Sequence, residues 1–321
     1  MITIFVHQGG ETKPVETLDP AWLQPGSPAR VWVDLTSPTD AEAAILNDVF
    51  HFHELAVEDA IGEILHPKIE SYGEYLYLVL HGIDFKASTH AFQTHEVDFF
   101  IGPNYLVTVH DEFSRSIARL ADVCPRNDFL LGEGVDALLH RIVDAMVDNY
   151  RPEVEKLEQR LDDVEHRVFE RPSQNDVRTI LALKRDVGSL RRVVTPQRDV
   201  LARLARREFP FVSDAVAYRF RDVYDHLVRL VEDANLFQDR VTGLLDAHLS
   251  FASNRLNQVM KVLTVISTVF MPLTVLTGMF GMNVTLPRLP GGEGAQFWWI
   301  CVLMAGISGS LLWFFTRGRW K

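Results

Sequence analysis

The stretch MKVLTVISTVFMPLTVLTGMFGMN, residues 260–283, contains an almost uninterrupted apolar run from Val262 to Phe280. A second apolar run extends from Phe297 to Phe315. Each run is about nineteen residues long, and a helix of that length crosses a hydrocarbon core of roughly 30 Å. The sequence therefore predicts two transmembrane helices, over 262–281 and 297–315, and a function that is exercised in a membrane.

The segment between the two runs is too short to hold a domain, so the two helices should form a hairpin whose ends lie on one side of the membrane. Basic residues occur outside the hairpin, whereas the connection contains a lone Arg288. The flanking basic residues are Arg255, Lys261, Arg317, Arg319 and Lys321. The positive-inside rule then predicts cytoplasmic N- and C-termini. We expect a multi-pass protein of the cell inner membrane.

The composition indicates a water-soluble body joined to a small membrane part. The 321 residues include 32 Lys and Arg against 43 Asp and Glu, which gives a net charge of −11 and disfavours nucleic acid as a partner. The two cysteines, Cys124 and Cys301, do not suggest a disulfide framework. The sequence has no phosphate loop, no His-Glu-x-x-His pattern and no nucleophile elbow, so we expect neither an enzyme nor a prosthetic group.

Residues 1–130 alternate strand-like and helix-like patterns and predict a cytoplasmic α/β domain. Strands are expected over 30–35, 75–80, 99–101 and 105–109, the last two joined by a Gly-Pro-Asn turn. Thr39 and Glu42 have the spacing of a capping box, which predicts a helix that begins there.

From 131 onward the pattern becomes helical, so the chain as a whole is assigned to the α+β class. Apolar residues recur every three or four positions at Leu139, Ile142, Met146, Tyr150, Val154, Leu157, Leu161, Val164 and Val168. A second helix is expected over 174–194, ended by Pro196, and a third over 213–279. We expect a helical stalk over 131–258 and the transmembrane hairpin over 259–321.

The third helix would be about 65 residues long and would expose its apolar stripe in a monomer, so we expect self-association as a coiled coil or helical funnel. On a 3.5-residue repeat, Asp246, Met260 and Thr274 lie on one line. Within roughly 50° of that line lie Asn257, Leu263 and Met271. Repeated around a symmetry axis, this face would make polar rings at both ends of a pore and apolar constrictions between them. Taken alone, the Met and Leu positions are more typical of ordinary helix packing than of a pore.

The ion chemistry of this face favours a hard cation. No acidic residue occurs between Phe251 and Gly292, so an ion would meet neutral oxygen dipoles. Such a path suits Mg²⁺, which keeps its hydration water, whereas thiolates or imidazoles for Zn²⁺ do not occur on the first span. Gly281 permits the helix to end, and Asn283 would offer its amide oxygen at the external mouth.

The residues from Met260 to Thr274, followed by Gly278 and by Gly281-Met282-Asn283, closely resemble the CorA family of divalent metal ion transporters, which includes ZntB-like members. The segments 55–59, 67–70 and 190–193 are similar to cytoplasmic parts of that family. The resemblance implies a homopentamer with a funnel-shaped cytoplasmic domain and a selectivity filter at Gly281, Met282 and Asn283. It also implies a regulatory cation site at Asp222, for which Asp84 of a neighbouring subunit is the candidate partner.

The loop after the filter departs from the Mg²⁺-transporting members. Its Leu-Pro-Gly-Gly character, over 284–293, resembles the ZntB branch, whereas Asn257 and residues 260–263 are closer to the Mg²⁺ branch. Our leading hypothesis is gated entry of hydrated Mg²⁺, with Co²⁺ and Ni²⁺ as further substrates. The alternatives are Zn²⁺ transport by the same scaffold and a non-conducting, membrane-tethered cation sensor. The expected partners are further copies of the chain, the lipid bilayer and divalent cations.

Overall fold

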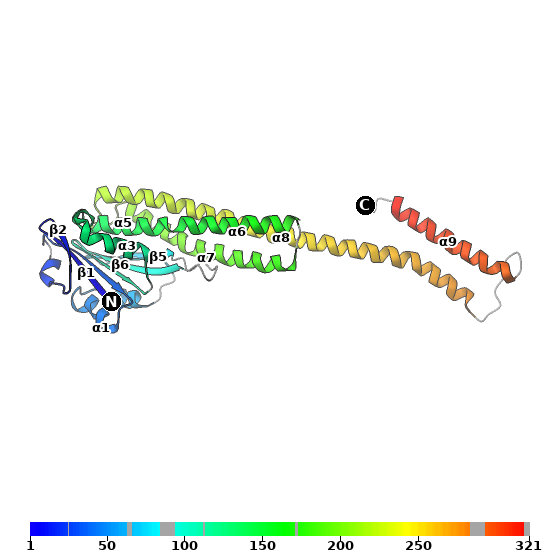
Figure 1. The fold of residues 1–321 in the computed structure, drawn as a ribbon, viewed down its shortest axis with the longest axis horizontal. Coiled ribbons are helices and arrows are strands. Elements are labelled where there is room, and N and C mark those ends of the chain that lie inside the picture. Colours follow the sequence, from blue (N-terminus) through cyan, green and yellow to red (C-terminus); the bar gives the residue numbers. More distant parts are fainter. Residues whose placement is uncertain are drawn as a thin grey trace. The chain divides into compact units, whose positions relative to one another are not determined.

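The computed structural model describes residues 1–24, 26–62, 66–83, 94–111, 113–170, 173–282 and 293–317. These residues form two compact units, Met1–Leu245 and Asp246–Lys321 (Figure 1). The first unit contains a seven-stranded sheet and the helices that pack on it, and the second contains two apolar helical segments. The helix α8 (Asp214–Phe280) contributes residues to both units.

The sheet has the strand order β2-β1-β3-β7-β6-β5-β4. Its strands are β1 (Ile2–Gln8), β2 (Glu11–Val15), β3 (Arg30–Thr36), β4 (Lys68–Ser71), β5 (Leu76–Ile83), β6 (Thr94–Ile101) and β7 (Tyr105–His110). The β3–β7 pair is parallel, while every other neighbouring pair is antiparallel. The four strands expected from the sequence are confirmed, and residues 102–104 join β6 to β7 as predicted.

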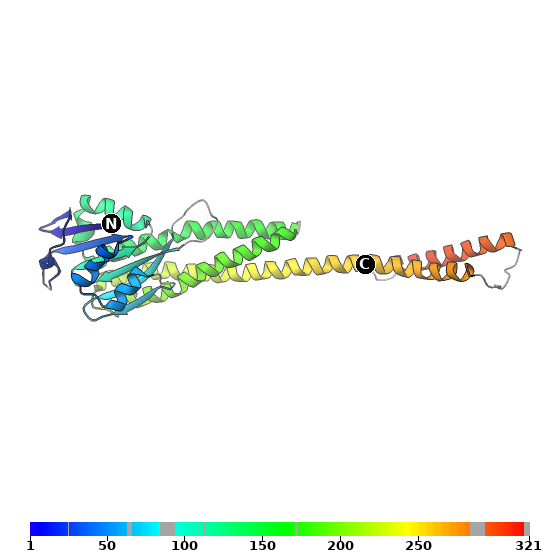
Figure 2. The ribbon, with the colours of Figure 1, turned by 90° about the horizontal axis from the view of Figure 1, so that it is seen from below.

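Both faces of the sheet are buried, because helices cover each of them. Successive side chains of β3 point to opposite faces, so Trp32 joins one hydrophobic cluster and Val33 joins the other. All eight residues of β5 are buried, as expected of a strand covered on both sides. The first unit is therefore a three-layer α/β/α sandwich, which can be followed in Figures 1 and 2.

Two short helices, α1 (Asp40–Asp48) and α2 (Glu54–Ile61), cover one face of the sheet. The predicted capping box is present, since the Thr39 hydroxyl accepts from the Glu42 amide while the Glu42 carboxylate accepts from the Thr39 amide. His53 caps α2 through a 3.2 Å hydrogen bond from the Leu55 amide to its Nδ1 atom. A 3₁₀ turn, η1 (Pro20–Leu23), precedes β3.

The other face is covered by the helical part of the first unit. It begins with α3 (Arg115–Val123), the 3₁₀ turn η2 (Cys124–Arg126), α4 (Asp128–Gly132), α5 (Val135–Asp148) and α6 (Tyr150–Glu170). All nine apolar positions expected to form one stripe are buried. The stripe belongs to two helices, because the chain turns at Asn149, whose side-chain amide donates to Ser116 Oγ at 2.9 Å.

The next helix, α7 (Gln174–Ala205), corrects one expectation from the sequence. Pro196 was expected to end this helix near Val194, but it lies inside it. The helix continues because its later turns are anchored to the sheet: Leu201 and Leu204 are fully buried, and the His81 amide donates to Gln197 Oε1 at 2.9 Å. Tertiary packing here outweighs the loss of one backbone hydrogen bond at proline.

The two long apolar helices predicted at the C-terminal end are confirmed as α8 and α9 (Glu293–Arg317). In the first unit α8 buries a stripe that includes Phe220 and Phe237. In the second unit its side chains are largely exposed, as are those of α9. Both helices are long and apolar enough to cross a membrane.

Candidate functional site

The predicted pore face lies on the part of α8 that belongs to the second unit. Its polar members, Asp246, Asn257 and Thr274, are all exposed. Its apolar members are also exposed, with Met260 at 59%, Leu263 at 54% and Met271 at 68% of their surface. Large apolar side chains at such exposure require lipid or further protein around them. In a single chain this face of α8 is therefore unpartnered.

Thr264 and Thr274 form side-chain hydrogen bonds to the backbone of this helix. Thr264 Oγ1 donates to the Met260 carbonyl at 2.7 Å, and Thr274 Oγ1 donates to the Phe270 carbonyl at 2.9 Å. Such bonds satisfy the hydroxyl proton at membrane depth. They leave the oxygen lone pairs as acceptors, which is the function that a hydroxyl ring around a hydrated cation would need.

The C-terminal end of α8 explains the glycine of the Gly-Met-Asn sequence. The Gly281 amide donates to the Thr277 carbonyl at 2.8 Å, and the Met282 amide donates to the Met279 carbonyl at 3.4 Å. A Cβ atom at position 281 would lie 2.9 Å from the Thr277 carbonyl oxygen, closer than a carbon can approach without a shift of the backbone. The structure thus supports a packing reason for glycine at the helix end. Asn283 lies outside the described residues, as does Asp84.

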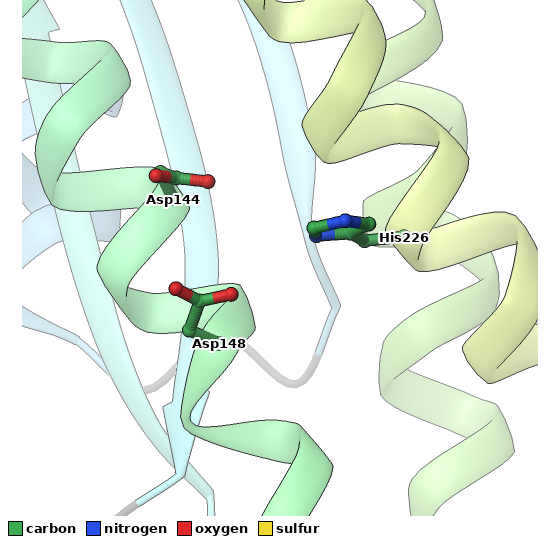
Figure 3. Close-up of side chains that lie close together, drawn as sticks. All are labelled: Asp144, Asp148 and His226. Atoms are coloured by element: carbon green, nitrogen blue, oxygen red, sulfur yellow. The ribbon is translucent and has the colours of Figure 1, made fainter.

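A second candidate site lies in the first unit, where two aspartates of α5 face a histidine of α8 (Figure 3). Asp144 and Asp148 are four residues apart and so project from the same side of α5. Each can offer one oxygen, and His226 can offer one ring nitrogen, with all three atoms within 4.8 Å of one another. Oxygen and imidazole ligands in this number suit a divalent cation that keeps part of its hydration shell.

The electrostatics of this cluster favour a bound cation. Burial raises the pKa of the Asp144 carboxyl, and the negative charges of Asp148 and Asp222 raise it further, while His140 and His226 act in the opposite direction. Asp222 is exposed and contributes to the same electrostatic environment. Burial also lowers the pKa of the His140 imidazole, which lies edge-on to Phe220. A divalent cation would relieve the repulsion among the carboxylates.

A cavity of about 360 Å³ adjoins the cluster and gives it access to solvent. Asp148 and His226 lie on its wall, together with further acidic residues, Glu155, Glu158 and Asp233, and the basic residues Arg151 and Arg229. This room allows an ion to bind with several of its waters in place.

Sequence reasoning selected Asp222 but missed Asp144 and Asp148. The pattern of this stretch is dominated by apolar positions such as Ile142 and Met146, which are buried. The signal that could have found the pair is the four-residue spacing of two carboxylates on the polar side of that helix. Asp222 belongs to the same unit as the cluster, whereas the predicted pore positions belong to the second unit.

Comparison with known proteins gives consistent matches along the whole chain. A family model described as "CorA-like Mg2+ transporter protein" matches residues 29–317. The cobalt/magnesium transport protein CorA of Thermotoga maritima is 31% identical over 293 residues, covering 90% of this chain and 83% of that relative. The zinc transport protein ZntB of Pectobacterium atrosepticum is 26% identical over 295 residues, covering 90% of this chain and 87% of that relative.

Among solved structures, the complete CorA magnesium transporter of Methanocaldococcus jannaschii aligns with a TM-score of 0.82. The alignment covers 100% of this chain and 99% of that one, at 21% sequence identity. At this low sequence identity, the match shows similarity of fold alone. The α/β domain, the long helix and the two C-terminal apolar helices thus occur together in a protein of known architecture.

Proposed function

This chain belongs to the CorA-like Mg²⁺ transporter family, and we propose that it admits hydrated Mg²⁺, with Co²⁺ and Ni²⁺ as further substrates, into the cytoplasm. As a family member it is a divalent cation transporter of a membrane. The proposal further specifies the transported ion, the residues that line its path and the number of subunits. An inside-negative potential would contribute about 4.6 kcal/mol per divalent ion per 100 mV to entry.

The observation that carries the proposal is the exposed face of α8, whose membrane part offers neutral oxygen atoms and neither a thiolate nor an imidazole. Asn257 and Thr274 supply amide and hydroxyl oxygens, and Met260, Leu263 and Met271 supply the narrow apolar rings. Residues 251–280 contain no Cys, His, Asp or Glu. Oxygen dipoles can accept hydrogen bonds from the water around Mg²⁺, and apolar rings can close a pore by dewetting. At the outer end, the filter of Gly281, Met282 and Asn283 would select the hydrated ion.

The path requires several copies of the chain around one axis. Met260, Leu263 and Met271 are more than half exposed in a single chain, so an assembly in which this face surrounds an axis would cover part of it. We propose the homopentamer that the family resemblance implies, in the inner membrane, with both termini cytoplasmic. In this arrangement residues 1–130 and 131–258 form the cytoplasmic domain and stalk, and residues 259–321 form the membrane part.

Cation binding at Asp144, Asp148 and His226 would regulate the pathway. Asp222 adds a further carboxylate near the cluster, and it was the position expected to hold a regulatory cation together with Asp84 of a neighbouring subunit. A cation held between α5 and α8 would fix the N-terminal part of α8 to α5 of the cytoplasmic domain. Loss of that cation at low cytoplasmic concentration would release α8 and favour opening.

The experiment that tests the proposal is ion flux into liposomes that contain the purified protein, with a fluorescent Mg²⁺ indicator inside. Asn283→Ala should abolish Mg²⁺ uptake while size-exclusion chromatography shows an unchanged oligomer. The matched control, Asn254→Ala, removes an exposed amide of α8 that lies about 100° from the predicted pore line and should retain uptake. Normal Mg²⁺ flux in the Asn283 variant would overturn the assignment.

Zn²⁺ is the second candidate substrate, because the loop over 284–293 resembles the ZntB branch and ZntB proteins are among the relatives. His226 would also suit Zn²⁺ better than Mg²⁺ at the regulatory cluster. Competition of Mg²⁺ and Zn²⁺ in the same liposomes separates the two. Zn²⁺ uptake that excess Mg²⁺ leaves unchanged would decide for the ZntB type.

A further inference from the structure

A pocket between the C-terminal end of α7 and the first turns of α8 is lined by basic residues, although the chain as a whole is acidic. It has a volume of about 350 Å³ and is lined by Arg206, Arg207, Arg221, Tyr218 and Tyr224, with Ala202 and Ala205. The chain as a whole carries a net charge of −11. Three guanidinium groups around one cavity therefore form a local positive site within a negative protein.

Two of the three arginines have no ion-pair partner among the residues that the structure describes. Arg207 pairs with Asp214 at 3.3 Å, whereas neither Arg206 nor Arg221 forms an ion pair with any residue in the described part of the chain. Nearby arginines behave differently: Arg203 pairs with Glu208 at 2.9 Å, and Arg219 pairs with Glu133 at 2.5 Å. Arg206 and Arg221 thus bring two guanidinium groups without an ion-pair partner among the described residues to one pocket.

Helix electrostatics explain only part of this arrangement. Arg206 follows the last residue of α7, where a cation interacts favourably with the free carbonyl groups of the helix end. Arg221 lies in the second turn of α8, where the helix dipole does not favour a cation. Arg207 adopts a left-handed backbone conformation with φ of 62°, which few residues other than glycine adopt. A bound anion would account for the three arginines together.

The tyrosines indicate what kind of anion fits. Tyr218 is 67% exposed, and Tyr224 is half-buried against the hydrophobic core. Both lie on the same side of α8 as Arg221, three residues before and three residues after it. The small side chains of Ala202 and Ala205 leave the space in front of these rings open.

Guanidinium groups bind phosphate oxygens in a bidentate manner, and tyrosine rings stack on nucleobases. The volume lies in the range of small-ligand pockets. We propose that this pocket binds a nucleoside triphosphate, with the phosphates at Arg206 and Arg221 and the base against Tyr218. The inference concerns a separate site of the cytoplasmic unit and does not depend on the transported ion.

The test is isothermal titration of the full-length protein in detergent with ATP, with inorganic tripolyphosphate and with adenosine, in EDTA. ATP should bind, tripolyphosphate should bind more weakly, and adenosine should not bind detectably. Arg206→Ala and Arg221→Ala should each weaken ATP and tripolyphosphate binding by about tenfold, since each loses a charged hydrogen bond. Tyr218→Ala should weaken ATP by about fivefold or more and leave tripolyphosphate unchanged.

The matched control is Arg178→Ala, which removes an exposed arginine of α7 that lies outside the pocket and has no ion pair with the described residues. Its ATP affinity should equal that of the unchanged protein. The proposal is overturned if ATP does not bind at millimolar concentration, or if Arg178→Ala weakens binding as much as the pocket variants do. It is also overturned if the pocket variants keep full affinity, or if they instead dissociate the oligomer, which would assign the arginines to contacts between subunits.

Discussion

Replacing Asp148 with Asn is expected to stabilise the ion-free protein and to weaken its response to Mg²⁺. In the absence of a cation, the Asp148 carboxylate repels the Asp144 carboxylate, and this repulsion is one reason why the pKa of Asp144 is raised. Removing the Asp148 charge relieves the repulsion. It also replaces one of the two carboxylate ligands that α5 offers to a cation with a neutral amide oxygen, which binds a divalent cation less strongly.

The two opposing effects can be estimated from the geometry. The two carboxylate oxygens lie at most 4.8 Å apart, and at that limit two unit charges repel by about 1 kcal/mol in water and by about 3.5 kcal/mol at an effective dielectric constant of 20. Because Asp148 is exposed, the lower figure applies, and it corresponds to a rise of about 2 °C in the unfolding midpoint. A cation at 100 times its dissociation constant adds about 2.7 kcal/mol, and a tenfold loss of affinity removes about 1.4 kcal/mol of that gain.

The assay is the unfolding midpoint of the purified oligomer, followed by intrinsic fluorescence during a Mg²⁺ titration that begins in EDTA. The curves of the unchanged protein and of Asp148→Asn should cross, with the variant higher in EDTA and lower in saturating Mg²⁺. Asp163→Asn, which removes an exposed carboxylate of α6 outside the cluster, should follow the unchanged protein at every concentration. Parallel curves for the Asp148 variant would refute the assignment of a cation to this cluster.

Three further outcomes follow from particular contacts. Gly281→Ala should lower Mg²⁺ flux in liposomes at an unchanged oligomeric state, because its Cβ atom would lie 2.9 Å from the Thr277 carbonyl oxygen. Arg240→Ala should destabilise the cytoplasmic unit by about 1 kcal/mol in chemical denaturation, since Arg240 bridges two carboxylates of α6 at 2.5 and 2.6 Å. A hydrogen bond from Arg219 holds the pKa of Glu133 below its ordinary 4.5. The interaction of the ionised Glu133 with Arg219 therefore stabilises the folded protein fully above pH 4.5, and this stabilisation is lost as the pH falls through the lowered pKa. Unfolding midpoints measured from pH 6 to pH 3 should therefore fall less steeply in Glu133→Gln, and equal slopes would contradict this.

Much of the fold could be predicted because its signals are local. The capping box of Thr39 and Glu42, the alternation in β3 and the repeating apolar positions between Leu139 and Val168 each specify an element within a few residues. The long helix α8 was predicted to within one residue at each end, because its helical pattern is interrupted at so few positions.

The features that sequence reasoning missed depend on distant parts of the chain. Pro196 does not end α7, because Gln197 and Leu201 are held by the sheet, and a proline signal contains no information about that packing. The Asp148 and His226 ligands are separated by about 80 residues in sequence and meet only when α5 packs beside α8. The arginine pocket likewise requires the turn between α7 and α8, which brings Arg206 and Arg221 to one cavity.

Ion entry as proposed requires that one face of α8 lines a water-filled path. Mg²⁺ flux in liposomes, measured before and after a charged methanethiosulfonate reagent, tests it on single-cysteine proteins in which Cys124 and Cys301 have been replaced by serine. Thr274→Cys places the thiol on the predicted face, whereas Leu276→Cys places it about 150° away on the same helix. If this face lines the path, the reagent blocks flux through Thr274→Cys and leaves Leu276→Cys unaffected. Block at position 276, or unchanged flux in the modified Thr274→Cys protein, would show that the path lies elsewhere.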